Sequence, residues 1–279
     1  MKFSVLVANF NNGKFFRDCY QSIISQSYTD WEVVILDDRS TDNSVQMITE
    51  IIGTDSRFRI IEHPKNEGVG VIKAKLIELA NGAICGFVDP DDAILPTAIE
   101  NAMTVFENEE KTVLTYSRFM TCDKDLNFLA PSKSSKQVVN KDPYFFNCPI
   151  VINHFVCFKR DVYLETEKIN PGLRISEDQD LYLKMYEKGD AKFINDINYL
   201  YRTHDGGISQ NDNKGKSYEY WGKVIWDTMQ RRGLKSIHNQ IIPEKFNNSE
   251  EIFRLIEYQN SFYYRLKRKI ATMFLVRPT

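Results

Sequence analysis

The chain lacks the features of a disulfide-stapled, zinc-binding or membrane-spanning protein. Its five cysteines are odd in number, and no two of them form a Cys-x-x-Cys pair. Scattered single cysteines are typical of buried thiols in a reducing compartment. No stretch approaches the roughly 20 apolar residues of a membrane-spanning helix, and the N-terminus has no signal-peptide pattern. We therefore expect a cytoplasmic protein.

The chain also lacks an excess of charge of one sign. Its 36 lysines and arginines nearly balance its 38 aspartates and glutamates, which leaves a net charge of -2. Such a balance produces no global field that would gather nucleic acid, so a charged ligand must be recognised locally. A length of 279 residues accommodates one large domain with an extension, or two modest domains.

The first 92 residues alternate short β-branched runs with segments of helical period. This alternation is typical of parallel strands joined by helices. Apolar stripes at residues 15–24 and 45–52 would cover the sheet. The predicted strands are Phe3–Val7, Val33–Leu36, Phe58–Ile61 and Ala83–Val88.

Three of these strands end in a polar turn, at residues 9–12, 37–42 and 89–92. In an open parallel sheet, ligands bind in the crevice beyond the carboxyl ends of the strands. The acidic side chains of the three turns are therefore expected to share one pocket.

The pattern after residue 92 is mixed and predicts an added antiparallel part. A lysine- and serine-rich stretch, residues 123–142, is interpreted as a surface loop or hairpin over the site. Residues 211–216 resemble a linker into helices rich in aromatic side chains. The other predicted elements are a helix after Pro96, a strand Thr112–Ser117, a block Val151–Phe158, a helix from near Ser176 and a strand Ala191–Tyr201.

Three carboxylates, Asp89, Asp91 and Asp92, directly follow the buried run at residues 84–88. Hard divalent ions such as Mn²⁺ or Mg²⁺ prefer oxygen ligands and leave coordination positions for phosphate. A polar turn that caps the next helix is the alternative interpretation. The strand in front and the two other acidic turns favour the metal site.

Six short motifs in a fixed order resemble those of the family-two inverting glycosyltransferases. The likeness spans residues 3–209 and depends on the order and spacing of the motifs rather than on any one of them. It implies a GT-A fold over residues 1–210, an α/β structure with a mostly parallel sheet and an added antiparallel part. The motifs lie at residues 4–11, 35–42, 66–68, 87–92, 176–181 and 201–204.

The resemblance divides the domain into a nucleotide-binding half, residues 1–92, and an acceptor half, residues 93–210. Residues 211–279 would form a helical C-terminal extension. The implied reaction moves a sugar from a nucleotide diphosphate donor, most often a UDP-sugar, to a hydroxyl group. The implied setting is bacterial polysaccharide or glycolipid assembly.

The resemblance also implies the nucleotide contacts. Asp38 would accept a hydrogen bond from an imide N–H of the base, a strong charge-assisted interaction. Lys73 stands where the family usually has an arginine facing the nucleotide, although a solvated helix lysine is an open alternative. Asp42 is assigned to capping. The main chain of three residues would line the base pocket: Ala8, Asn9 and Phe10.

For the metal, the resemblance implies Asp92 as the main ligand. Asp91 would contact the ribose or assist the metal, whereas Asp89 is assigned a structural role. His204 would supply a metal ligand or a phosphate donor, and a purely structural histidine is the open alternative.

Inverting transfer needs one general base to take the proton of the acceptor hydroxyl. The candidate is Asp178, with Glu177 as its neighbour or as an acceptor contact, and His154 would border the acceptor pocket. Ser176 and Gln179 fit a capping box, which would place both acids in the first turn of a helix. Acids that simply complement the helix dipole are the alternative.

The tail, residues 262–279, has five basic and no acidic residues interleaved with aromatic and aliphatic ones. This composition is typical of a helix at an anionic membrane surface, which predicts peripheral contact with the inner face of the cell membrane and a lipid-linked acceptor. A helix packed on the catalytic domain is the alternative.

Two other functions are weighed for the whole chain. A sugar nucleotidyltransferase would want a glycine-rich, basic phosphate loop after the first strand, which residues 8–13 do not provide. A nucleotide-sugar-binding or scaffolding protein would have no need of a base such as Asp178.

Overall fold

The computed structural model describes residues 1–204 and 214–273. The predicted domain boundary at residue 210 lies outside the described residues. Of the predicted linker, residues 211–213 also lie outside them, whereas residues 214–216 begin a helix. Within the described ranges, no helix is both long and apolar enough to span a bilayer.

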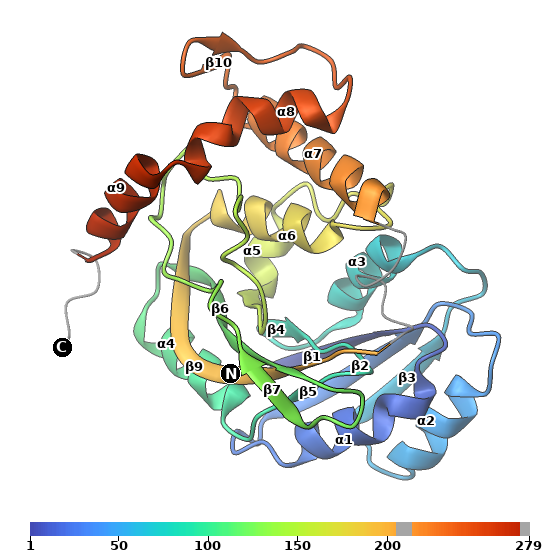
Figure 1. Ribbon diagram of the computed structural model, residues 1–279. Helices are drawn as coiled ribbons and strands as arrows, with labels where there is room; N and C mark the ends of the chain where they lie inside the picture. The colour runs from blue at the N-terminus through green and yellow to red at the C-terminus, as the bar shows by residue number, and fades with distance from the viewer. Residues whose placement is uncertain (205–213, 274–279) are drawn as a thin grey trace.

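A mixed nine-stranded sheet forms the centre of the molecule (Figure 1). Its strands lie in the order β3-β2-β1-β4-β8-β6-β9-β5, and β7 pairs with β6. The bounds are β1 (Phe3–Asn9), β2 (Trp31–Asp37), β3 (Phe58–Glu62), β4 (Ile84–Phe87), β5 (Ala93–Ile94), β6 (Thr112–Cys122), β7 (Phe128–Pro131), β8 (Cys157–Lys159) and β9 (Asp190–Arg202).

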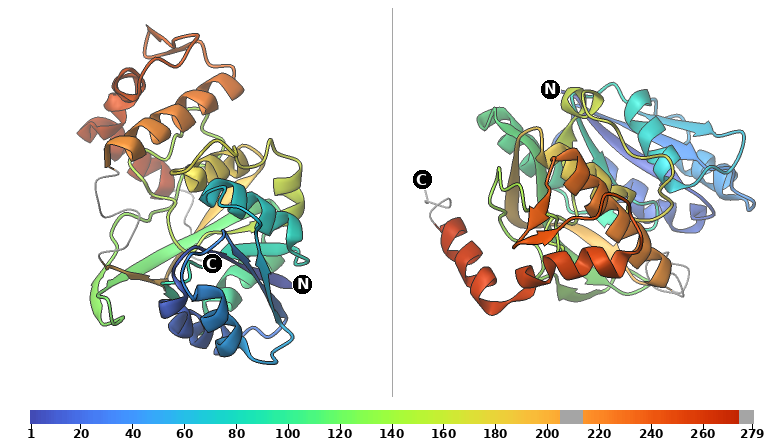
Figure 2. Two further views of the ribbon diagram at one scale, coloured as in Figure 1. Left: turned by 90° about the vertical axis from the view of Figure 1, so that its right-hand side faces the viewer. Right: turned by 90° about the horizontal axis from the view of Figure 1, so that it is seen from above.

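The helices pack on both faces of this sheet and extend beyond it (Figure 2). Two 3₁₀ helices, η1 (Gly13–Phe15) and η2 (Glu257–Asn260), and a small hairpin of β10 (Ser236–Ile237) and β11 (Gln240–Ile241) complete the fold. The α-helices are α1 (Phe16–Ile24), α2 (Ser44–Ile52), α3 (Val69–Leu79), α4 (Ala98–Asn108), α5 (Arg160–Leu164), α6 (Glu177–Tyr186), α7 (Lys214–Arg231), α8 (Ser249–Ile256) and α9 (Phe262–Met273).

The first four strands are parallel, as predicted, and both faces of this part of the sheet are buried. On β1, Val5 and Val7 face a core made with α1, α2 and α4, whereas Leu6 faces a core made with α3 and α6. Successive side chains of a strand point to opposite faces, so a continuous apolar run is what two covered faces require.

The antiparallel part is also present. Strand β8 pairs antiparallel with β4 and β6, and β9 runs parallel to β6 but antiparallel to β5. The stretch predicted as a loop or hairpin contains β7, which forms a hairpin with the end of β6. In the predicted block Val151–Phe158, only the last two residues belong to a strand.

The C-terminal helices pack on the α/β part through their own core. Phe146, from the segment before β8, is fully buried among Ile225 and Met229 of α7 and Ile252 of α8. Val224 of α7 belongs to the same apolar cluster as Leu181 of α6. The extension therefore shares its core with the domain that precedes it.

Candidate active site

The turns after β1 and β2 meet through direct hydrogen bonds. The Asn9 amide donates to Asp37 Oδ1 at 2.6 Å, and the backbone N–H of Asp38 donates to the Asn9 carbonyl at 2.8 Å. Asn9 is buried and Ala8 half-buried, whereas Phe10 is exposed. The first two polar turns therefore form one surface at the carboxyl edge of the sheet. As assigned, Asp42 accepts the N–H of Ser44 in the first turn of α2.

The buried carboxylate of Asp38 holds the start of α3. Its two oxygens accept the backbone N–H groups of Glu67 and Gly68, each at 2.8 Å. Asn66 donates its amide to the Asp38 carbonyl at 3.0 Å. Asp38 therefore has a structural function in addition to any contact with a nucleotide base.

Asp92 is buried, with 2% of its surface exposed, and it holds β9 in place. Its Oδ2 accepts the Tyr199 hydroxyl and its Oδ1 accepts the Arg202 N–H, both at 2.7 Å. Burial, reinforced by Asp89 and Asp91, raises the pKa of Asp92 well above its usual value. Both oxygens of the Asp92 carboxyl group are therefore engaged inside the protein, and its assignment as the main metal ligand stays a prediction.

Asp91 and His204 form a pair at the edge of the same turn. Asp91 Oδ2 lies 2.9 Å from His204 Nε2, and the Phe15 ring lies 4.5 Å from the His204 ring. The described residues contain no group of three or more acidic, histidine or cysteine side chains arranged to hold a metal. A carboxylate and an imidazole nevertheless fit a divalent ion whose other ligands come from substrate phosphates and water.

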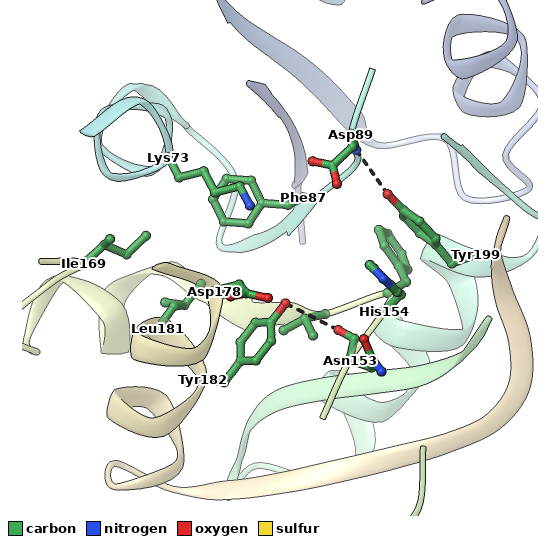
Figure 3. A pocket seen from close by; sticks show the side chains of 12 residues that line it. Lys73, Phe87, Asp89, Asn153, His154, Ile169, Asp178, Leu181, Tyr182 and Tyr199 are labelled. Carbon is green, nitrogen blue, oxygen red and sulfur yellow. Dashed lines mark hydrogen bonds between the residues drawn. The ribbon is translucent and has the colours of Figure 1, made fainter. Parts of the chain in front are cut away.

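A pocket of about 60 Å³ lies between β4, α3, α6 and β9 (Figure 3). Figure 3 shows Lys73, Asp89 and Asp178 approaching it from three different elements. Seven of its lining residues carry polar side chains: Lys73, Asp89, Asn153, His154, Asp178, Tyr182 and Tyr199. Basic and acidic side chains from parts of the chain that are distant in sequence thus line the same pocket.

Lys73 points to the start of α6. Its Nζ lies 2.7 Å from Glu177 Oε1, and both side chains are largely buried. Burial alone would lower the pKa of Lys73, but the nearby carboxylates Glu177, Asp89 and Asp178 outweigh it and raise that pKa. The alternative of a solvated helix lysine is therefore wrong.

Asp178 is the second acid at the start of α6, and it faces the pocket. Burial and the charge of Glu177 raise the pKa of Asp178 to about 6, against the lowering effects of Lys73 and the Gln179 hydrogen bonds. A carboxylate with a pKa near 6 is ionised at neutral pH yet basic enough to accept a proton.

The predicted capping box at Ser176 and Gln179 is wrong. Ser176 adopts a left-handed conformation with φ of 66°, and its side chain makes no capping hydrogen bond. An N-cap residue normally has extended backbone angles. The buried Gln179 side chain instead accepts the Asn147 amide at 2.7 Å. The sequence placed Glu177 and Asp178 correctly in the first turn, but for a reason that the structure does not support.

His154 lies against an aromatic wall of the pocket. Its ring stacks on Tyr199 at 4.7 Å and on Tyr201 at 5.2 Å. Burial, with a smaller contribution from Lys73, lowers the pKa of His154 to about 4, so the ring is neutral at physiological pH.

Asp89 and Tyr199 have larger parts in the site than the sequence indicated. Asp89 lines the pocket, and burial, opposed by Lys73, raises its pKa. Its backbone N–H donates to the Tyr199 hydroxyl at 3.2 Å. No local sequence motif marks Tyr199, and the three consecutive buried residues from Asn198 to Leu200 show no period-two pattern.

Comparison with known proteins shows the family of this chain. Residues 4–166 match the model of glycosyl transferase family 2, which covers more than half of the chain. The chain therefore belongs to glycosyl transferase family 2, and the match does not favour the nucleotidyltransferase weighed as an alternative.

Two curated relatives illustrate the range of the family. The chain is 27% identical over 237 residues to chondroitin synthase from Escherichia coli, which covers 83% of this chain and 33% of that protein. It is 25% identical over 221 residues to glycosyltransferase GlyG from Streptococcus pneumoniae, which covers 75% of this chain and 73% of that protein. The chain thus spans only a third of the chondroitin synthase that it matches.

Solved structures confirm the predicted GT-A fold. The S. aureus TarS structure in complex with UDP-GlcNAc matches with a TM-score of 0.70 at 19% identity, over 94% of this chain and 73% of that one. The mannosyltransferase PcManGT from Pyrobaculum calidifontis, in complex with GDP-Man and Mn²⁺, matches with a TM-score of 0.60 at 15% identity, over 92% and 69% of the two chains.

Proposed function

We propose that this chain transfers a sugar from a UDP-sugar to a hydroxyl group of a saccharide, with inversion, in polysaccharide or glycolipid assembly. The observation that carries the proposal is the pocket that places Asp178 beside the paired Lys73 and Glu177. Binding alone requires no carboxylate with a pKa near neutrality, whereas deprotonating an alcohol does. The chondroitin synthase relative and the UDP-GlcNAc complex of the structural neighbour support the substrate class.

In this proposal the nucleotide lies against the surface formed by the turns after β1 and β2. The backbone of Ala8, Asn9 and Phe10 lines the base, and Asp38 accepts the imide N–H through lone pairs that Glu67 and Gly68 do not use. The same carboxylate fixes the start of α3, so binding of the base and the position of Lys73 depend on one residue. Residues 1–92 would then be the nucleotide-binding half and residues 93–210 the acceptor half.

A divalent ion, Mn²⁺ or Mg²⁺, would be held by Asp91 and His204 rather than by Asp92. When bound, such an ion neutralises the charge that develops on the departing diphosphate. Asp92 contributes by holding Tyr199 and Arg202, which fixes the end of β9 from which His204 follows. Asp91, whose carboxylate lies beside the histidine, would bind the ion, and the buried Asp92 would keep its structural role.

Asp178 acts as the general base. Its carboxylate takes the proton of the acceptor hydroxyl as that oxygen bonds to C1 of the sugar and the bond from C1 to the diphosphate oxygen breaks. Lys73 neutralises Glu177, which lets Asp178 ionise beside a second acid. Neutral His154, stacked on Tyr199 and Tyr201, offers a flat apolar face for the saccharide.

The donor part of the proposal is tested by melting temperature with UDP and Mn²⁺ together and separately. Saturation at about 100 times the dissociation constant should add about 2.7 kcal/mol to stability. No shift with UDP and Mn²⁺, or with the other nucleoside diphosphates, would contradict nucleotide binding.

The transfer part is tested with the Asp178→Asn variant. We expect it to keep the UDP shift and to lose transfer to a saccharide acceptor. Proton NMR of the product should show the anomeric configuration opposite to that of the donor, and a retained configuration would contradict the proposed mechanism.

A further inference from the structure

The last described helix, α9, carries an apolar face that no other part of the described chain covers. Phe262 and Tyr263 are 82% and 79% exposed, and Leu266 and Ile270 are 42% and 48% exposed. Figures 1 and 2 show α9 at the periphery of the molecule, on the side of the C-terminal helices. Four large exposed apolar residues within one helix of twelve are more than scattered surface exposure accounts for.

Helical geometry places these four residues on one stripe. At about 100° per residue, Phe262, Leu266 and Ile270 advance along one face within a sector of about 80°, and Tyr263 borders it. Arg265 and Lys269 flank the stripe on one side and Lys267 flanks it on the other, and all three are exposed. The helix contains no acid; Glu257, in η2, is the nearest acidic residue that precedes it.

The opposite side of α9 attaches the helix to the protein. The Tyr264 ring contacts Tyr258 at 5.1 Å, and the Arg268 guanidinium lies 5.2 Å from the centre of the Phe145 ring. Tyr264 and Arg268 are four residues apart, so they lie on one side of the helix. The attachment therefore fixes which face of α9 points outward.

We propose that the outward face of α9, defined by Phe262, Tyr263, Leu266 and Ile270 with Arg265, Lys267 and Lys269, docks on an anionic lipid bilayer. Apolar side chains enter the boundary between headgroups and acyl chains, and flanking cations extend to the lipid phosphates. Twelve residues span only about 18 Å, so the helix lies in the membrane plane.

The positive charge of the outward face of α9 favours a lipid surface over a second copy of this chain as the partner. Pairing two copies of the stripe across a twofold axis would bring two sets of like-charged lysines and arginines together, with no acid on the helix to offset them. An anionic bilayer instead attracts each basic residue near its surface. Of the predicted tail, residues 274–279 lie outside the described chain and are not needed for this docking.

The test is co-sedimentation of the full chain with vesicles made of equal parts of phosphatidylserine and phosphatidylcholine. We expect binding to these vesicles, little binding to pure phosphatidylcholine, and loss of binding as salt is raised. Replacing Arg265, Lys267 and Lys269 by Gln should lower the partition coefficient on the order of 100-fold. Replacing Phe262, Leu266 and Ile270 by Ser should abolish binding.

The matched control replaces Phe128 and Leu129 of β7 by Ser, because both are exposed apolar residues on another element. This control should bind vesicles like the unchanged chain. Unchanged melting temperatures in all variants show that they are folded. Equal vesicle binding by the α9 variants and the unchanged chain would overturn the proposal, as would no binding by the unchanged chain. Self-association that only the α9 variants lose would assign the face to a second copy instead.

Discussion

Two adjacent acids at the start of α6 have different surroundings, because Lys73 forms its ion pair with Glu177 and not with Asp178. Glu177 accepts a hydrogen bond from Lys73 at 2.7 Å, whereas Asp178 receives its hydrogen bonds from Gln179 of its own helix. Burial and the charge of Glu177 raise the pKa of Asp178. The environment of each side chain, and not its type, is the basis for the two roles that we propose.

The first prediction concerns the pH dependence of transfer. A base must be unprotonated to act, so kcat/KM should fall as the pH decreases through about 6, the pKa of Asp178. Asp178→Asn should lower the rate by about 100- to 10,000-fold, the usual contribution of a general base. The measurement is a pH–rate profile, and a flat profile between pH 5 and 8 would contradict the assignment.

The second prediction concerns Lys73. Lys73→Met leaves Glu177 buried and unpaired, which should cost about 3 to 5 kcal/mol of unfolding free energy. In any folded fraction the pKa of Asp178 should rise, because Lys73 lowers it, so the acidic limb of the pH–rate profile should move to higher pH.

Two further variants separate charge from packing at Lys73. Lys73→Arg keeps the charge and should keep the acidic limb in place. The double variant Lys73→Met with Glu177→Leu removes both charges and should recover most of the stability. A single Lys73→Met variant as stable as the unchanged chain would contradict the importance of the pair.

At the scale of elements, two aspartates predicted to bind the nucleotide or the metal also connect strands and helices through hydrogen bonds. Asp38 ties the end of β2 to the start of α3 through Glu67 and Gly68. Asp92 ties the turn after β4 to the end of β9. Such junctions hold the pocket walls at fixed distances, which is what a preorganised site requires.

The third prediction separates Asp91 from Asp92. Asp92→Ala leaves the Arg202 N–H and the Tyr199 hydroxyl without their acceptor and should lower the free energy of unfolding by about 2 kcal/mol or more. Asp91→Ala should cost less stability but should remove the Mn²⁺-dependent part of the UDP melting shift. Thermal melts of both variants with and without Mn²⁺ and UDP decide this, and a Mn²⁺ effect that survives in Asp91→Ala would exclude Asp91 as a ligand.

The fourth prediction concerns the contact between α3 and the segment before α6. A Cβ atom at Gly70 would lie 2.3 Å from the Leu173 carbonyl oxygen, so Gly70→Ala must displace backbone and should cost about 1 to 3 kcal/mol. Gly215→Ala in α7 is the matched control, because a Cβ there meets nothing within 4 Å. Because Gly215 is the second residue of α7 and is exposed, this change should alter stability by no more than about 0.5 kcal/mol. Equal urea-unfolding midpoints for the two variants would contradict the close contact.

At the scale of the whole molecule, the C-terminal helices are part of the fold rather than a separate unit. Arg231, the last residue of α7, and Arg232 directly after it both pair with Glu187, which follows α6. Together with the core around Phe146, these contacts join α7 and α8 to the segments before and after β8. The α6 side of the pocket therefore packs against residues that the sequence placed in an extension.

The fifth prediction follows from that shared core. Deleting residues 214–279 would expose Phe146 and the α6 surface that Val224 covers, so the truncated chain should aggregate or melt well below the full chain. Solubility and calorimetry measure this. Deleting only residues 262–279 should leave the UDP shift intact, and an equally stable chain lacking residues 214–279 would show that the extension is autonomous.

The sequence by itself determined the parallel strands, their order along the chain and the carboxyl edge where the polar turns meet. Period-two and period-3.6 patterns report burial locally, so they need no knowledge of the fold. Glu177 and Asp178 were placed in a first turn by a capping box that proved wrong, and the composition of the tail indicated the apolar, basic character of residues 262–273.

Only the tertiary structure decided the surroundings of each acid. Asp91 and Asp92 are neighbours in sequence, yet one lies beside His204 and the other is buried against Tyr199, more than 100 residues away. The pairing of Lys73 with Glu177 and the direction in which α9 faces also depend on contacts between distant segments. Burial and the sign of nearby charge set the protonation of a carboxyl group, and both arise only when the chain has folded.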